Sequence, residues 1–102
     1  MNMDGSRFTK SERKELRKLA GLAYERELAK ALELLEAYFK QWRKDNITGF
    51  ELNERIHTFH NGIARDLWNY YTNGPSEMIV KRAIEEGSIL KTEISQGILE
   101  KL

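Results

Sequence analysis

The chain has 102 residues, of which 40% are hydrophobic and 32% are charged, and its formal net charge is +1. This composition predicts a single globular domain, residues 1–102, with a modest core. The small net charge excludes attraction of the whole protein to nucleic acid. The absence of cysteine excludes disulfides, thiolate chemistry and zinc–cysteine clusters.

The sequence also gives no sign of membrane association. No apolar run approaches the roughly 18 residues that a membrane span needs, and the N-terminus MNMDGSRF lacks the apolar core of a signal peptide. We therefore expect a cytoplasmic protein, and nothing in the sequence predicts a cofactor. A single proline and many Ala, Leu, Glu and Lys residues favour helix over sheet.

The first predicted helix covers about residues 9–44. Residues 1–8 are polar and are expected to be frayed. Thr9 and Glu12 have the T-x-x-E spacing of a capping box, in which each side chain accepts a hydrogen bond from an otherwise unpaired backbone N–H. Apolar residues then recur at helical spacing and predict a buried face: Leu16, Ala20, Ala23, Ala31, Leu34, Leu35, Tyr38 and Trp42.

The apolar arc of this helix is unusually wide. Leu28, Leu32 and Phe39 extend it to nearly half of the circumference. One antiparallel partner helix does not need so wide an arc. Either two further helices of the same chain or a second copy of the chain is therefore expected to pack on it.

The second predicted helix covers about residues 49–73. Thr48 and Glu51 again have the spacing of a capping box, and apolar residues repeat every three or four positions after them. Asp45 and Asn46 leave room only for a tight connection, which predicts an antiparallel helical hairpin. The helix should end at Gly74-Pro75.

The C-terminal region predicts shorter elements. Residues 75–86 read as a third helix with Gly87 as its stop, and residues 88–102 as a fourth short helix or a tail that orders on docking. Residues 95–102 are expected to be a flexible tail if no such helix forms. The predicted fold is all-α: a long antiparallel helical hairpin with one or two short C-terminal helices packed across it, a small helical bundle.

One flank of the second helix combines aromatic, histidine and amide side chains with little charge. On a regular helical wheel its members lie between roughly 80° and 160° from Leu52, beside the apolar face. This composition is typical of the buried centre of a protein interface. Either the protein's own C-terminal region or a partner is expected to cover the flank, which consists of Asn53, His57, His60, Ala64, Trp68 and Tyr71.

The two histidines raise the question of a metal site. Glu54 precedes His57 by three residues, the ligand spacing of di-iron carboxylate bundles. The helical wheel turns Glu54 toward solvent, however, so we favour a chance match over a metal site at His57 and His60. No Ser or Cys nucleophile is spaced to pair with either histidine, so no catalytic residues are predicted.

Glu27 is the one carboxylate predicted inside the apolar arc of the first helix. Burial of a carboxylate is costly unless it is paired or hydrogen-bonded. In the antiparallel hairpin it should lie opposite Leu67 and Tyr70, so we predict a hydrogen bond to a tyrosine hydroxyl or a pair with an arginine of a neighbouring chain. A ligand-binding or proton-handling role is the alternative.

The start of the first helix carries a basic patch. The first predicted helix is longer than the second by roughly 15 Å, and the excess should project at its N-terminal end. A phosphate backbone would bind such a surface, although Glu12 and Glu15 dilute its charge and a solvated helix end is the simpler interpretation. The patch consists of Lys10, Arg13, Lys14 and Arg17.

Together these features predict a small non-enzymatic interaction or regulatory protein. A homodimer built on the broad apolar face of the first helix is the expected assembly, and another protein is a further possible partner. A nucleic-acid-associated regulator that uses the basic patch is the first alternative. A small-molecule or metal-binding protein that uses His57 and His60 is the second.

Overall fold

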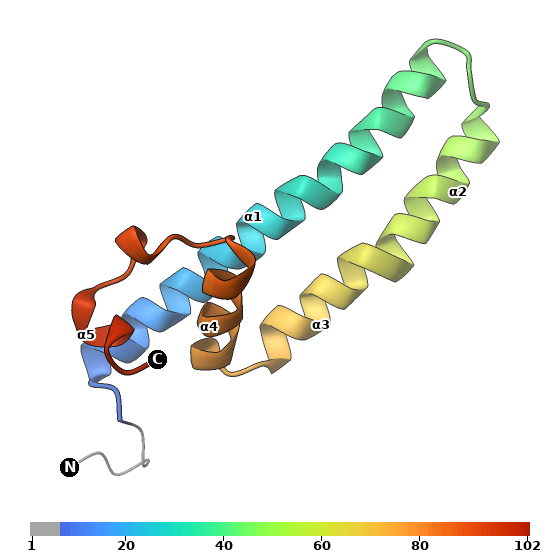
Figure 1. Ribbon diagram of the computed structural model, residues 1–102. Coiled ribbons are helices and arrows are strands. Elements are labelled where there is room, and N and C mark those ends of the chain that lie inside the picture. The colour runs from blue at the N-terminus through green and yellow to red at the C-terminus, as the bar shows by residue number, and fades with distance from the viewer. Residues whose placement is uncertain (1–6) are drawn as a thin grey trace.

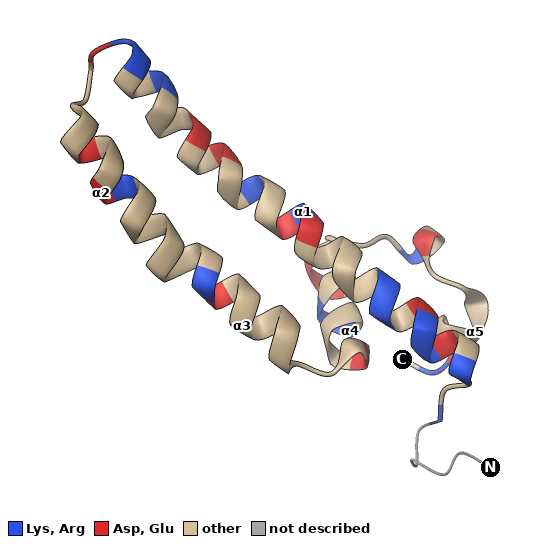
Figure 2. Ribbon diagram, turned by 180° about the vertical axis from the view of Figure 1, so that it is seen from behind, with Lys and Arg blue, Asp and Glu red and all other residues tan. Residues whose placement is uncertain are grey.

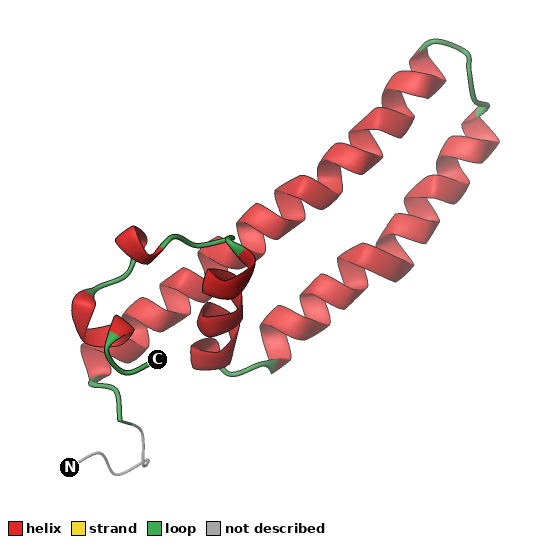
Figure 3. Ribbon diagram, in the orientation of Figure 1, coloured by secondary structure: helices red, strands yellow, loops and turns green. Residues whose placement is uncertain are grey.

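The computed structural model describes residues 7–102 as a long two-helix hairpin with shorter helical segments gathered at one end (Figure 1). The described residues contain helices and loops and no strand (Figure 3). The predicted all-α hairpin with short C-terminal helices is confirmed. Its elements are α1 (Lys10–Arg43), α2 (Gly49–Phe59), the π-helical segment η1 (His60–Ala64), α3 (Arg65–Asn73), α4 (Ser76–Glu86), the 3-10 segment η2 (Lys91–Glu93) and α5 (Gln96–Leu99).

Side-chain hydrogen bonds cap the N-terminal ends of α1 and α2. The Thr9 hydroxyl accepts from the N–H of Glu12 at 3.1 Å, and the Glu12 carboxylate accepts from the N–H of Thr9 at 2.8 Å. The Thr48 hydroxyl accepts from the N–H of Glu51 at 3.1 Å. Because these bonds satisfy backbone donors that a helix start leaves unpaired, α1 and α2 begin where the sequence predicts.

The second arm of the hairpin is one continuous helical rod of α2, η1 and α3. The π-helical segment interrupts the regular hydrogen-bonding pattern of this rod. It inserts about one residue, which turns α3 by roughly 100° relative to an uninterrupted α-helix. The side chains of α3 therefore point in directions that a regular helical wheel does not give.

The core lies at one end of the hairpin, where α4 packs against the N-terminal half of α1 (Figure 1). Gly74 allows a close turn into α4, and Gly87 ends that helix with a left-handed φ of 81°. Tyr70 and Tyr71 of α3 pack against the same core. The buried contact joins Leu16, Leu19, Ala20 and Ala23 of α1 to Ile79, Val80 and Ala83 of α4.

Residues 88–102, which we call the C-terminal strap, complete this core. Ile89, Ile94 and Ile98 of the strap are buried in it. Residues 95–102 are expected from the sequence to be a flexible tail if no helix forms there. In the structure they contain α5 and the fully buried Ile98. Phe8, within the segment expected to be frayed, is buried in the same core. Residues 1–6 of that segment lie outside the described part of the chain.

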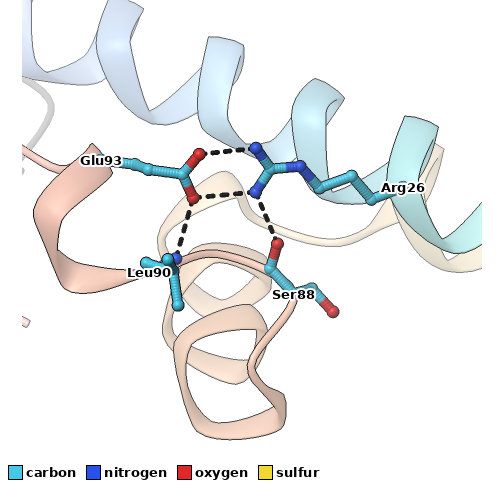
Figure 4. A network of polar contacts seen from close by, with 4 residues as sticks. All are labelled: Arg26, Ser88, Leu90 and Glu93. Atoms are coloured by element: carbon cyan, nitrogen blue, oxygen red, sulfur yellow. Dashed lines mark hydrogen bonds and ion pairs between the residues drawn. The ribbon is translucent and has the colours of Figure 1, made fainter.

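Charged residues of α1 hold the strap in place. Arg26 donates two hydrogen bonds to the Glu93 carboxylate, at 2.5 and 2.8 Å, and one to the Ser88 carbonyl at 2.8 Å (Figure 4). Glu93 also accepts from the N–H of Leu90 at 2.9 Å. The Arg26 guanidinium, with help from this N–H, holds the pKa of Glu93 at about 2.

Two further contacts bind the strap to the start of α1. The Glu15 carboxylate accepts from the N–H of Ser95 at 2.9 Å, and the Lys101 ammonium donates to Glu12 at 2.6 Å. The Lys101 contact lowers the pKa of Glu12. Both acidic residues of this helix end are thus engaged with the strap.

The remainder of the hairpin extends far beyond the core, and the molecule is 61 Å long. We call this part, residues 28–43 of α1 with residues 49–68 of α2–α3, the distal arm. Among its hydrophobic residues only Ala31 and Leu52 are buried. The distal arm is thus a single layer of two helices without a core of its own.

We expect acid to loosen the strap because Glu93 has a lowered pKa in the folded protein. Its stabilising contribution is complete above its ordinary value of 4.5 and is lost as the pH falls toward 2. Glu93→Gln should therefore lower the Tm at pH 7 by a few degrees and flatten its acid dependence. Thermal unfolding across this pH range measures both effects, with the exposed Glu85→Gln as control. Parallel pH profiles for parent and Glu93→Gln would contradict the assignment.

Candidate interaction surface

The distal arm carries a groove on each of its two sides. The first groove lies on the side of α1 that faces the core further along the helix. Leu34 and Tyr38 follow Leu16 and Ala20 by five full turns of α1, so each pair points in one direction. This core-side groove has a volume of about 410 Å³. Its lining also includes Leu35, Ala37, Gln41, Arg55, Thr58, Phe59 and Ile63.

The second groove lies on the opposite side of the hairpin. Leu28 and Leu32 lie roughly 120° and 160° around α1 from Leu34, so they face away from the core-side groove. We call this side the open side. One groove of about 460 Å³ there is lined by Tyr24, Leu28, His60, Ala64, Arg65 and Trp68. It is followed along α1 by a hollow lined by Leu32, Leu35, Glu36, Phe39, Lys40 and Arg43.

Large apolar side chains are exposed on both sides of the arm. Leu34 on the core side is 56% exposed, and Leu32 on the open side is 45% exposed. Trp68 is 57% exposed although it lines the open-side groove. Scattered exposed leucines are ordinary on a protein surface, but contiguous apolar patches of this kind mark interaction sites.

The structure divides the flank predicted on the second helix. His60, Ala64 and Trp68 come together in the open-side groove. Asn53 and His57 are exposed and lie outside the lining of that groove. Tyr71 turns instead toward α1, where its ring stacks on Tyr24 at 4.8 Å between centroids.

The π-helical segment explains this division. A regular wheel places Trp68 and Tyr71 at roughly 160° and 100° from Leu52. A backward turn of roughly 100° after η1 brings Trp68 to the edge of the apolar face and Tyr71 into it. The side chains of His60 and Trp68 consequently border one groove, with Leu28 and Tyr24 across from them.

Glu27 lies where α1, α3 and α4 meet, and it is partly exposed. The Tyr71 hydroxyl donates a hydrogen bond to its carboxylate. Burial, followed by the negative charge of Glu27, raises the pKa of Tyr71 above its ordinary value. Tyr70 instead packs edge-on against Tyr71, beneath the guanidinium of Arg82 at 4.6 Å from its centroid. Glu27 thus has a tyrosine partner, one residue later in the chain than the predicted Tyr70.

The basic patch at the start of α1 is not a bare overhang, because α4 and the strap pack along this end of the helix. Lys10, Lys14 and Arg17 are exposed, whereas Arg13 is partly buried and donates to the Phe8 carbonyl at 2.9 Å. Figure 2 shows acidic residues interspersed among the basic residues along this stretch.

Metal-binding side chains do not gather around His57 and His60. Within residues 7–102, no three His, Asp or Glu side chains lie close enough together to hold a metal ion. His60 lies on the open side. His57 lies on the exposed surface next to it.

Sequence reasoning did not assign Tyr24 and Arg65 to the candidate site. Tyr24 precedes Leu28 by one helical turn, so its place beside the groove was available from spacing alone. Arg65 follows the π-helical segment directly, and its place depends on that irregularity. The Arg26–Glu93 contact joins residues far apart in the sequence, and no local pattern indicates it.

Comparisons of this chain with protein-family models, curated proteins and solved structures found no match. Along residues 7–102, no helix has the combined length and apolar character needed to cross a membrane.

We expect Tyr71→Phe to lower the free energy of unfolding by about 1 kcal/mol, because it removes the hydrogen bond to Glu27 and keeps the stacked ring. Urea unfolding followed by circular dichroism measures the change. Tyr38→Phe is the matched control, since the Tyr38 ring lies beneath Arg55 in the distal arm. Equal effects of the two substitutions would show that the Glu27 contact does not stabilise the fold.

We expect a Lys10→Ala, Lys14→Ala and Arg17→Ala triple variant to keep the parent stability to within about 0.5 kcal/mol, because exposed side chains contribute little. Arg13 is retained for its bond to Phe8. Fluorescence anisotropy with a labelled DNA duplex at 50 and 200 mM salt tests the nucleic-acid alternative. Binding that weakens steeply with salt and is lost in the triple variant would favour that alternative.

Proposed function

We propose that this protein is a small non-enzymatic interaction protein that acts as a homo-oligomer through its distal arm. One observation carries the proposal: the arm consists of two helices without a core, yet it exposes large apolar residues on both sides. Such a layer gains stability when another helical surface covers it, as in a four-helix bundle.

The energetic gain from covering the arm is substantial. Complete burial of a leucine or phenylalanine side chain contributes about 1.5–3 kcal/mol, and roughly half of that remains available where the side chain is half exposed. The side chains of Leu32, Leu34 and Trp68 are each about half exposed. In a two-fold dimer each exposed side chain is buried twice, once from each copy, and this gain acts against the entropy lost when two molecules associate.

A second copy of the chain is the favoured partner. Most soluble oligomers are homo-oligomers with closed symmetry, and two-fold dimers are the commonest. A second hairpin arm also has the length and the two-helix width of the surface that it would cover. The proposal assigns no reaction to His60 or Arg65, which border the open-side groove as polar neighbours of its apolar lining.

We expect sedimentation of the parent at micromolar concentration to give a species of twice the 12.0 kDa chain mass or larger. The Tm should rise with protein concentration, because association stabilises only the folded state. A Leu32→Gln, Leu34→Gln double variant, altered on both sides of the arm, should sediment as a monomer.

Met78→Gln is the matched control, since Met78 is 66% exposed on α4 outside the arm. It should leave the mass unchanged. A parent that remains a 12.0 kDa monomer at about 100 μM, with a Tm independent of concentration, would refute homo-oligomerisation.

A further inference from the structure

A regular apolar seam runs along α1 where the contact between the two hairpin helices meets the open side: Leu35 also lines the core-side groove, and Trp42 lies near Gly49 of α2. The seam residues are spaced alternately four and three apart, the repeat of helices that pack side by side in a coiled coil. Leu32 and Trp42 of the seam are 45% and 41% exposed, and the other members are half-buried. The seam consists of Leu28, Leu32, Leu35, Phe39 and Trp42.

This seam is symmetric about its middle residue. Leu28 and Trp42 lie equally far from Leu35, and Leu32 and Phe39 lie three and four residues from it. A helix that pairs with a reversed copy of itself about Leu35 therefore brings apolar residues opposite apolar residues along its whole length.

Exposed aromatic residues of α2–α3 are arranged symmetrically about the same level of the arm. The most exposed of these, Phe50 at 89% and Trp68 at 57%, lie equally far from Phe59 along the chain. Phe59 and Leu35 line one groove, so the two helices share one midpoint level. Phe50 precedes His57 by two turns and so lies on the same outer edge of the open side.

We propose that a second copy of the chain packs antiparallel on the open side, with a two-fold axis beside Leu35, and completes a four-helix bundle. This inference rests on the proposed function and specifies its partner. Leu35 then meets the partner's Leu35, and Leu32 meets the partner's Phe39. Trp68 reaches the level of the partner's Phe50. Apolar residues from one half of the surface thus face apolar residues from the other half of the partner's surface, as a two-fold interface requires.

The reverse choice, a parallel pair, fits the surface less well. A two-fold axis along the hairpin would place the seam of α1 over α2–α3 of the partner. Its apolar residues would then face Asn53, His57 and His60, whose polar groups lose water without gaining a partner. The antiparallel arrangement places α1 on α1, so the two apolar seams face each other, and it places the polar residues of α2–α3 opposite their own copies.

One pair of opposite charges at the edge of the seam favours the same orientation, whereas Glu36, which pairs with Lys40 of its own chain, lies next to the partner's Glu36 at the axis. Glu25 and Arg43 are separated by five full turns of α1, so they lie on one edge of the helix. Reversal about Leu35 brings each Glu25 to within about one turn of the partner's Arg43. Exposed pairs of this kind add little affinity, but opposite charges select one orientation over the other.

The core-side groove is less suited to this pairing. Its lining includes Gln41, Arg55 and Thr58, and the Arg55 guanidinium lies over the Tyr38 ring at 4.9 Å. A partner on that side would have to displace or desolvate these polar groups. The open-side grooves also include charged residues, Glu36, Lys40, Arg43 and Arg65, but these border the seam, and all five seam positions are apolar.

Spin labels at the hairpin tip test the orientation. The chain has no cysteine, so Asn46→Cys provides a single labelling site. The two tips of the antiparallel dimer lie about 33 Å apart along the bundle, because position 46 is eleven residues of 1.5 Å rise from the axis. We expect pulsed electron spin resonance to give a distance above about 30 Å. A distance below about 20 Å indicates parallel chains and overturns the inference.

A second cysteine tests which side is used. Glu36→Cys, on the open side next to Leu35, should form a disulfide with the partner's copy under mild oxidation. Leu32→Gln should weaken dimerisation at least tenfold in sedimentation equilibrium. Leu34→Gln, on the core side at a position that is 56% exposed, should leave it within about twofold. Circular dichroism confirms that both variants keep their helix content.

The outcomes separate the inference from the proposed function. A monomeric parent would overturn both. A dimer that is weakened by Leu34→Gln and unaffected by Leu32→Gln would overturn the open-side inference and leave homo-oligomerisation standing.

Discussion

A layer of two helices has two faces, and within residues 7–102 the rest of the chain covers only one end of one face. The 34 residues of α1 extend about 50 Å, whereas the 11 residues of α4 extend about 17 Å. In the structure, α4 and the strap pack at one end of the hairpin. The position of α4 therefore decides which apolar residues become core and which remain on the surface.

The two ends of the molecule consequently depend on different interactions. At the core end, burial of Val80, Ile89 and Ile98 is complete within one chain, and ion pairs such as Arg26–Glu93 fix the strap over it. Exposed ion pairs are individually weak, so the strap relies on several anchors along α1 together with its buried isoleucines. Among the hydrophobic residues of the distal arm only Ala31 and Leu52 are buried. Under the proposed homo-oligomerisation, the stability of the arm would depend on protein concentration.

Local signals in the sequence were sufficient to predict the hairpin. The capping threonines and Gly87 act within a few residues, so their consequences can be read directly from the chain. The docking of α5 could not be predicted in this way. Gly97 weakens a helix by itself, but a side chain there would approach Glu12 to 2.7 Å. Its absence lets α5 lie close to α1, and only the tertiary structure reveals that reason.

The structure separates the residues of the predicted flank for a single physical reason. A helical wheel assumes a constant turn per residue, and η1 breaks that assumption between His60 and Ala64. Before this segment Leu52 lies on the buried face as predicted, and after it the prediction is off by about one position. Glu27 therefore pairs with Tyr71 although the regular wheel favours Tyr70.

The same irregularity joins the two ends of the molecule. It turns Tyr71 toward Tyr24 and the core, and it keeps Trp68, one turn earlier, on the open side. A regular helix would rotate both side chains by roughly 100° and would separate the Tyr71 stack from α1. π-Helical segments are rare and appear mostly as single turns inside α-helices. Here the segment accompanies the stacking of Tyr71 on Tyr24 and the exposed position of Trp68. The exposed apolar surface of the arm is thus set in part by how α3 docks on the core.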